Sequence, residues 1–216
     1  MYHRINRKKY SIYAFDLESH NDEESISKQE TSMWLGCFIN ENNTIDDESS
    51  YLYSIKEFVD RLEELSSAKR HKNSDTRPCK NIAVFIYNLS FEWSFILPEL
   101  KRRGYIFKDS IEKDDECVYN SVSTKSVSSV WMCNIKFKKN SGSIILRDLA
   151  KIYGGGLGKV AKAFNLPTQK GEIDYRLNRT QVKNNLENII RNNNQDECPN
   201  ILIYHAPIFS LEELEK

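Results

Sequence analysis

Apolar positions in the first part of the chain fall in short runs that predict strands. Residues 10–17 (YSIYAFDL) are rich in Ile, Tyr and Phe and alternate loosely with polar residues, which is typical of a strand. The runs TSMWLGCFINE at 31–41 and SSYLYS at 49–54 predict a second and a third strand. Three strands in succession favour an antiparallel meander at the start of the fold.

The middle of the chain changes to helical spacing and back. Residues 55–65 predict a helix with one buried stripe, because its apolar positions recur every three or four residues: Ile55, Phe58, Val59, Leu62 and Leu65. The run IAVFIY at 82–87 is continuously apolar, which is typical of a strand covered on both faces. Residues 91–103 predict a second helix that contains Pro98 and stops at Gly104.

The remaining pattern is more broken. A hairpin is expected within 105–137, and the segments 129–137 and 143–149 predict two further strands. Three glycines at 154–156 interrupt the chain before a short predicted helix at 157–166. Strands followed by alternating strands and helices predict an α/β fold with a mixed β-sheet flanked by helices. A last amphipathic helix is expected at 180–194.

Composition narrows the class of protein. The 216 residues suffice for one domain plus a tail, and 39% hydrophobic with 29% charged residues describes a soluble globular protein. No window approaches eighteen apolar residues and no signal-peptide run precedes Asp16, so we expect no membrane partner and a cytoplasmic location, in a cell or a virus-infected host. Five scattered cysteines without a C-x-x-C pair favour reduced thiols over a zinc site or disulfides.

Charge gives no general attraction to nucleic acid. Lys and Arg number 31, as do Asp and Glu, so the formal net charge is zero. A polyanionic partner would therefore need local basic patches. The two candidates are residues 101–103 (KRR) and 136–139 (KFKK), although such runs are commonly solvated faces.

Candidate chemistry begins with the motif D-x-E at Asp16 and Glu18. Residues i and i+2 of a strand point to the same face, so the two carboxylates stand side by side. Such a pair suits a divalent cation, since Mg²⁺ prefers oxygen ligands, and two ions about 3.5–4 Å apart support phosphodiester hydrolysis. Taken alone, the motif is more often a solvated strand edge than a metal site.

A second motif follows the buried strand at 82–87. There, Glu92 falls just inside a predicted helix start, a place where α/β folds build sites. Asn88 offers an amide for hydrogen bonding, and Phe91 offers a ring on which a base can stack. The alternative is a turn residue at Asn88 and a core residue at Phe91.

A third motif ends the strand at 143–149. Asp148 is followed by the glycine-rich bend, a helix containing K-A-F-x-L, and the sequence KGEIDY at 170–175. The glycines do not form the G-x-x-x-x-G-K-S/T phosphate loop. By itself this segment indicates only a loop.

Together and in this order, the motifs D-x-E, N-L-x-F-D/E, and D-L with K-A-F-x-L and KGEIDY resemble one family. It is the N-terminal 3′–5′ exonuclease domain of protein-primed family B DNA polymerases of the viral and organellar type, and the resemblance covers roughly residues 10–175. It implies a ribonuclease H-like fold, two Mg²⁺ or Mn²⁺ ions held by four carboxylates, and a single-stranded DNA 3′ end as partner. By the same resemblance Asp16, Glu18 and Glu92 are catalytic metal ligands, while Asn88 and Phe91 contact the DNA.

The chain departs from that family at two places. The second motif usually carries Asp where this chain has Glu92, which is longer by one methylene. The third motif, Tyr-x-x-x-Asp on a late helix, is missing; its only match, Tyr105 to Asp109, comes too early and on a predicted strand. Asp196 is its best substitute, so Asp148 or Asp196 completes the metal ligands.

The expected organisation is an exonuclease domain at 1–176 and a divergent helical tail at 177–216, with no polymerase domain after it. Two functions stay open. One is a metal-dependent exonuclease acting on single-stranded DNA, with a separately encoded polymerase domain as a further candidate partner. The other is a weakened or inactive single-strand-binding module, or the remnant of a split polymerase gene.

Overall fold

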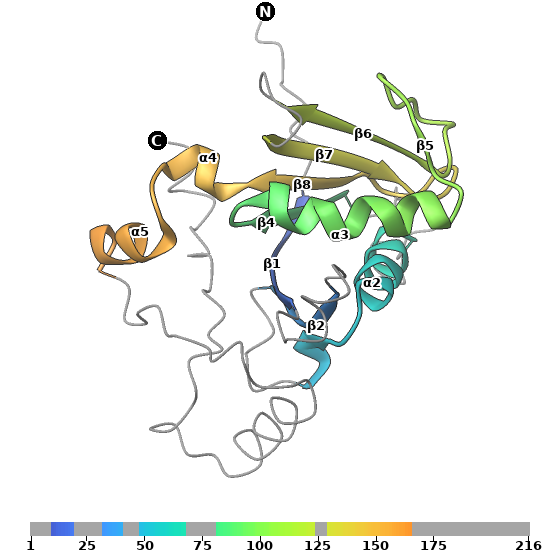
Figure 1. The fold of residues 1–216 in the computed structure, drawn as a ribbon. Helices are drawn as coiled ribbons and strands as arrows, with labels where there is room; N and C mark the ends of the chain where they lie inside the picture. Colours follow the sequence, from blue (N-terminus) through green and yellow to red (C-terminus); the bar gives the residue numbers. More distant parts are fainter. Residues whose placement is uncertain (1–9, 20–31, 41–47, 68–80, 124–128, 166–216) are drawn as a thin grey trace, which may run out of the picture.

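The computed structural model describes residues 10–19, 32–40, 48–67, 81–123 and 129–165 (Figure 1). Its first half comprises β1 (Tyr10–Ser19), β2 (Met33–Asn40), the 3₁₀ turn η1 (Glu48–Ser50), β3 (Tyr51–Leu52), α2 (Ile55–Ser67), β4 (Asn81–Ile86) and α3 (Leu89–Arg102). The second half comprises β5 (Ile106–Phe107), β6 (Val118–Ser123), β7 (Val130–Lys136), β8 (Ile144–Asp148), α4 (Leu149–Tyr153) and α5 (Leu157–Ala163).

The described strands form one mixed sheet in the order β3-β2-β1-β4-β8-β7-β6-β5. β1, β2 and β3 pair antiparallel, which confirms the predicted meander, and β6, β7 and β8 are antiparallel as well. The central strands β1, β4 and β8 are parallel, with Phe15 level with Ile86 and Ile86 level with Asp148. Their carboxyl ends therefore meet at one edge of the sheet.

The main core lies between the sheet and the helices α2 and α3. In β1, Tyr13, Phe15 and Leu17 are buried, and the alternate residues are half-buried. Phe15 stacks on Phe58 of α2 with ring centroids 3.8 Å apart, and Phe58 is fully buried. The alternation places Asp16 and Glu18 together on the opposite face of β1, as the sequence predicts.

α3 begins directly after β4 and runs through Pro98 to Arg102, in agreement with the expected helix. It lies alongside α2, and Figure 1 shows α3 crossing in front of the sheet. Arg103, just after α3, joins the two helices: its guanidinium donates to Glu99 Oε1 at 2.7 Å and to the Lys56 carbonyl at 3.0 Å. The C-terminal end of α3 is thereby held against α2.

The helix α4 was absent from the sequence prediction, whereas β5 falls on the strand expected at 105–109. α4 is a five-residue helix directly after β8, within a segment interpreted only as a bend. β5 pairs with β6 over two residues, at the edge of the sheet. Tyr105, just before β5, is buried against Phe137 with ring centroids 5.7 Å apart, whereas Asp109 is exposed. The tyrosine of the early Tyr-x-x-x-Asp match is therefore a core residue.

Several expectations concern residues outside the described ranges. They include the amphipathic helix at 180–194, the tail at 177–216 and the candidate ligand Asp196. Among the cysteines that the structure describes, Cys37, Cys117 and Cys133 are free thiols. No helix in the described part of the chain is both long and apolar enough to cross a membrane.

Candidate metal centre

Most of the predicted site residues lie at the edge where β1, β4 and β8 end. Asp16 and Glu18 belong to the last part of β1, and Asp148 is the last residue of β8. Asn88, Phe91 and Glu92 lie at the junction between β4 and α3. Three segments far apart in the sequence thus bring their candidate residues to one edge of the sheet, and only Asp196 falls outside the described residues.

Asp16 and Glu18 occupy the half-buried face of β1 near a register shift between Glu18 and Ser19. Asp16 is paired in the sheet with Cys37 of β2. Burial, and secondarily the negative charge of Asp16, raise the pKa of the Cys37 thiol to about 12. The D-x-E pair therefore adds negative charge to a poorly solvated part of the sheet.

Glu92 lies in the first turn of α3 and is 2% exposed. Burial raises the pKa of its carboxyl to about 9, and the charge of Asp16 acts in the same direction. A hydrogen bond from its own backbone N–H lowers the pKa, and the charges of Asp148 and Glu18 raise it by less. Its Oε2 atom is buried and has no hydrogen-bond partner. In the absence of a cation this carboxyl is consequently protonated near neutral pH.

Asp148 is also 2% exposed, and its two oxygens differ in their surroundings. Oδ1 accepts hydrogen bonds from the backbone N–H of Ala150 at 2.8 Å and of Asn88 at 3.2 Å. The first of these bonds makes Asp148 the N-cap of α4. Oδ2 is buried without a partner.

These carboxylates have the donor chemistry for a hard divalent cation. Two of their oxygens, Glu92 Oε2 and Asp148 Oδ2, are buried and unpartnered, and buried polar atoms in native proteins are normally satisfied. Within the described ranges, no three Asp, Glu, His or Cys side chains are close enough together to form a metal site. The charges of Asp16, Asp148 and Glu18 act on Glu92 over distances longer than a coordination bond. The carboxylates are therefore neighbours, but they are not assembled into a set of metal ligands.

Asn88 and Phe91 lie on the solvent side of the same junction. Asn88 is exposed and adopts the left-handed conformation, with φ 67° and ψ 53°, and its side chain makes no capping hydrogen bond. Phe91 is 41% exposed and meets Phe95 edge-on, with ring centroids 5.3 Å apart. Phe91 is therefore an exposed residue and not a core residue.

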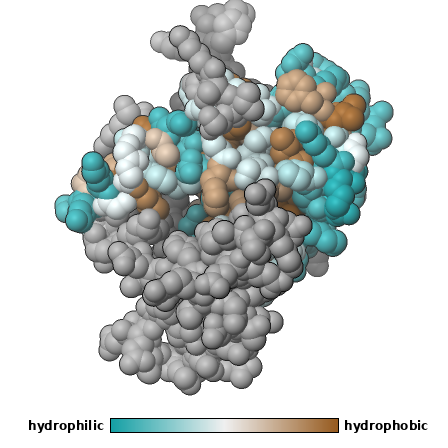
Figure 2. Space-filling model, in the orientation of Figure 1, coloured by the Kyte–Doolittle hydropathy of each residue, from teal (hydrophilic) through white to brown (hydrophobic). Residues whose placement is uncertain are grey.

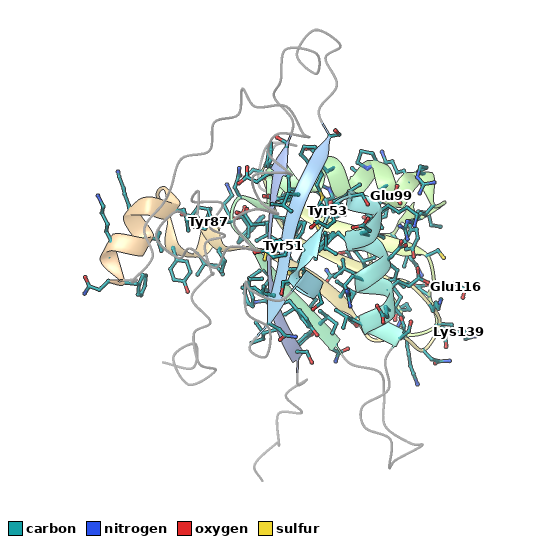
Figure 3. All side chains as sticks on the ribbon, turned by 90° about the horizontal axis from the view of Figure 1, so that it is seen from below. Tyr51, Tyr53, Tyr87, Glu99, Glu116 and Lys139 are labelled. Atoms are coloured by element: carbon teal, nitrogen blue, oxygen red, sulfur yellow. The ribbon has the colours of Figure 1, made fainter. Side chains whose placement is uncertain are left out.

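Tyr87 provides a contact that sequence reasoning missed. Its hydroxyl donates to the Gly155 carbonyl at 2.7 Å, and Figure 3 shows Tyr87 on the side of the sheet toward α4 and α5. Gly154 and Gly155 have φ of 68° and 75°, which glycine adopts readily. A tyrosine at a strand end and a later glycine run were both visible in the sequence, but only the fold shows that they meet.

The two basic runs are largely engaged with acidic side chains. Arg103 pairs with Glu99 and Asp60, both at 2.7 Å, and Arg102 pairs with Glu99 at 2.7 Å. In the second run, Lys138 pairs with Glu63 at 2.9 Å. On the face of the molecule drawn in Figure 2, hydrophobic residues are scattered among hydrophilic ones in the described part of the chain. Because these cations already pair with carboxylates, they are poor candidates for a phosphate-binding patch.

Comparison with known proteins identifies one family. A sequence model of the family described as DNA polymerase type B, organellar and viral, matches residues 74–207, which is more than half of the chain. No curated protein matches the chain.

Solved structures share the fold. Phi29 DNA polymerase in a ternary complex with primer-template DNA and incoming nucleotides is similar with a TM-score of 0.56 and 22% identity, over 80% of this chain. The same polymerase bound to single-stranded DNA is similar with a TM-score of 0.56 and 23% identity, over 79% of this chain. This chain spans 26% of the length of the phi29 polymerase chain in both. The predicted α/β fold, a mixed β-sheet flanked by helices, is thereby confirmed, and it is similar to the fold of part of phi29 DNA polymerase.

Proposed function

Since the chain belongs to the organellar and viral family of type B DNA polymerases, we propose that it performs 3′–5′ exonucleolytic hydrolysis of single-stranded DNA with divalent cations. The family takes part in DNA replication, and family B polymerases usually use divalent metals. Removal of nucleotides from a 3′ end is the reaction expected of a proofreading domain. Bound Mg²⁺ or Mn²⁺ would supply activation of the attacking water and charge stabilisation of the leaving oxygen.

One observation carries the proposal. Glu92 Oε2 and Asp148 Oδ2 are buried, unpartnered carboxylate oxygens at the same edge of the sheet as the D-x-E pair. Four carboxyls from three segments thus lie at one edge of the sheet, and a bound cation would favour their charged forms. Asp16, Glu18 and Glu92 would hold the metal, with Asp148 or Asp196 completing the ligands.

The substrate side of the proposal concerns Asn88 and Phe91. An exposed ring can stack on a terminal base, and an exposed amide can hydrogen-bond to a base or a sugar. Phi29 DNA polymerase, whose fold is similar, is known in complexes with single-stranded and primer-template DNA. These features support a single-stranded 3′ end as the ligand.

A second function is favoured by a different observation. The described carboxylates do not form a three-residue metal cluster, and Glu92 replaces the usual aspartate. A domain that has lost its metal ligands but kept Asn88 and Phe91 would bind a single strand without cleaving it. A separately encoded polymerase domain is a further partner under either function.

The test uses the purified chain and a 5′-labelled single strand with Mg²⁺ or Mn²⁺. We expect the labelled strand to shorten one nucleotide at a time from its 3′ end, and an Asp16→Ala, Glu18→Ala double variant to lose this activity. Asp109→Asn, an exposed carboxylate after β5, is the control for loss of charge elsewhere. Shortening no faster than in the double variant would contradict the nuclease, and strand binding by the same inactive protein would then support the binding module.

A further inference from the structure

The two carboxylate oxygens of Asp148 lie in different surroundings. Oδ1 is held by the N–H groups of Ala150 and Asn88, whereas Oδ2 is buried and unpartnered. Because the residue is 2% exposed, Oδ2 has little access to water. A charged oxygen in this position is unfavourable unless a ligand meets it.

We propose that Asp148 couples divalent-cation binding to single-strand binding, with Oδ2 as a cation ligand and Oδ1 positioning Asn88 for the DNA. This inference rests on the proposed function and deepens it. It identifies Asp148 as the residue that links the cation-binding carboxylates to the residues that would bind single-stranded DNA. Asp148 is then both a metal ligand and the positioning residue for Asn88.

The cation half follows from the surroundings of Oδ2. Glu92 Oε2 is a second buried and unpartnered carboxylate oxygen, and it comes from a different element, α3. The negative charge of Asp148 acts on Glu92, so the two groups lie within electrostatic range. When both carboxyls are charged, their oxygens repel each other, and a shared divalent cation would convert that repulsion into attraction.

The strand half follows from the backbone of Asn88. A non-glycine residue at φ 67° is held there by its neighbours, because the left-handed region is unfavourable for side chains with a Cβ atom. Asp148 Oδ1 accepts the Asn88 N–H at 3.2 Å, and the adjacent Tyr87 is tied to Gly155 at 2.7 Å. The β4–α3 junction is therefore joined to both ends of α4, and a cation that fixes Asp148 also fixes Asn88.

Two substitutions separate the two oxygens. Asp148→Asn removes the charge but keeps a carbonyl oxygen, which the two N–H donors orient toward themselves. Asp148→Ser keeps an N-cap acceptor for α4 but is too short to reach Asn88. Asp109→Asn again serves as the matched control for charge.

Cation affinity is measured by titration with Mn²⁺, and strand affinity by fluorescence anisotropy of a labelled oligonucleotide in EDTA. For Asp148→Asn we expect a loss of about tenfold or more in cation affinity and a strand affinity close to that of the parent. For Asp148→Ser we expect cation affinity to fall as well, together with about a fivefold loss of strand affinity. Exchange of the Asn88 amide proton should be slow in the parent and in Asp148→Asn, and fast in Asp148→Ser.

Unchanged cation affinity in Asp148→Asn overturns the proposal, as does unchanged strand affinity in Asp148→Ser. If the parent binds both ligands, these results leave the proposed function standing. A parent that binds neither overturns both. If Asp148→Ser fails to fold, the coupling is tested in the parent protein alone. Addition of Mg²⁺ should then slow the exchange of the Asn88 amide proton, and an unchanged exchange rate overturns the inference.

Discussion

At the scale of single residues, Glu92 has the environment that most opposes its own charge. It is 2% exposed, and neighbouring acidic groups add to the effect of burial on its pKa. A residue of this kind weakens the protein in which it lies unless a ligand compensates. Carboxylates in such surroundings are frequent at functional sites, because sites require groups that the fold alone does not satisfy.

The pKa of Glu92 gives a prediction about stability in EDTA. Its folded value, about 9, lies above the ordinary value of 4.5, so the folded state binds the proton more tightly. The stability associated with this group is complete below pH 4.5 and is lost as the pH rises toward 9. Glu92→Gln does not titrate, so its melting temperature should exceed that of the parent by more at pH 8 than at pH 5.

Thermal melts of both proteins at the two pH values provide the measurement. Asp109→Asn is the control, since its carboxylate is exposed and should change neither value. An equal difference between Glu92→Gln and the parent at both pH values would show that Glu92 does not carry an elevated pKa.

At the scale of elements, the packing of β1, β2 and α2 determines where the D-x-E pair lies. Phe15 is fixed between Phe58 and Phe38, with ring centroids 3.8 and 6.4 Å apart. Gly36 of β2 leaves the room that the Phe15 ring needs. Because β1 alternates, fixing Phe15 on one face also fixes Asp16 on the other.

Substitution of Gly36 tests this packing. A Cβ atom there would lie 2.8 Å from a ring carbon of Phe15 and would also collide with Met33. Gly36→Ala should therefore destabilise the protein by about 1–3 kcal/mol. Gly158→Ala in α5 is the matched control, since its Cβ meets no atom within 4 Å, and it should be neutral or slightly stabilising. The free energy of unfolding in urea measures both, and equal stabilities would refute the steric role of Gly36.

At the scale of the whole molecule, the parallel arrangement of β1, β4 and β8 gathers acidic groups that are distant in sequence. Figure 1 shows β8 leading into α4 beside the start of α3. Such a gathering is unfavourable without counter-charge, so folding and cation binding should be linked. If the proposed cation binds there, the molecule should be more stable with the cation than without it.

Addition of Mn²⁺ should raise the melting temperature of the protein. At a Mn²⁺ concentration one hundred times the dissociation constant, the free energy of unfolding should increase by about 2.7 kcal/mol. The Asp16→Ala, Glu18→Ala double variant should lose this gain, and NaCl at equal ionic strength separates specific binding from screening. An equal gain in the parent and in the double variant would show that the D-x-E pair does not bind the cation.

Prediction from sequence succeeded where a local pattern is sufficient. The stripe of α2, the alternation of β1 and the apolar run of β4 each have a periodicity that one segment contains by itself. α4 was missed because its five residues are too few to show a period, and its formation depends on the N-cap at Asp148. The strand expected at 105–109 is confirmed as β5, but it covers only the two residues that pair with β6.

The sequence by itself determined the fold class, the positions of the main strands and helices, and the side-by-side placement of Asp16 and Glu18. These follow from residue periodicity, which is a local property of the chain. Only the tertiary structure decided that Asp148 holds Asn88, that Tyr87 reaches Gly155, and that Glu92 and Asp148 keep unpartnered oxygens. Burial and hydrogen bonding between distant segments depend on the register of parallel strands, and no single segment contains that information.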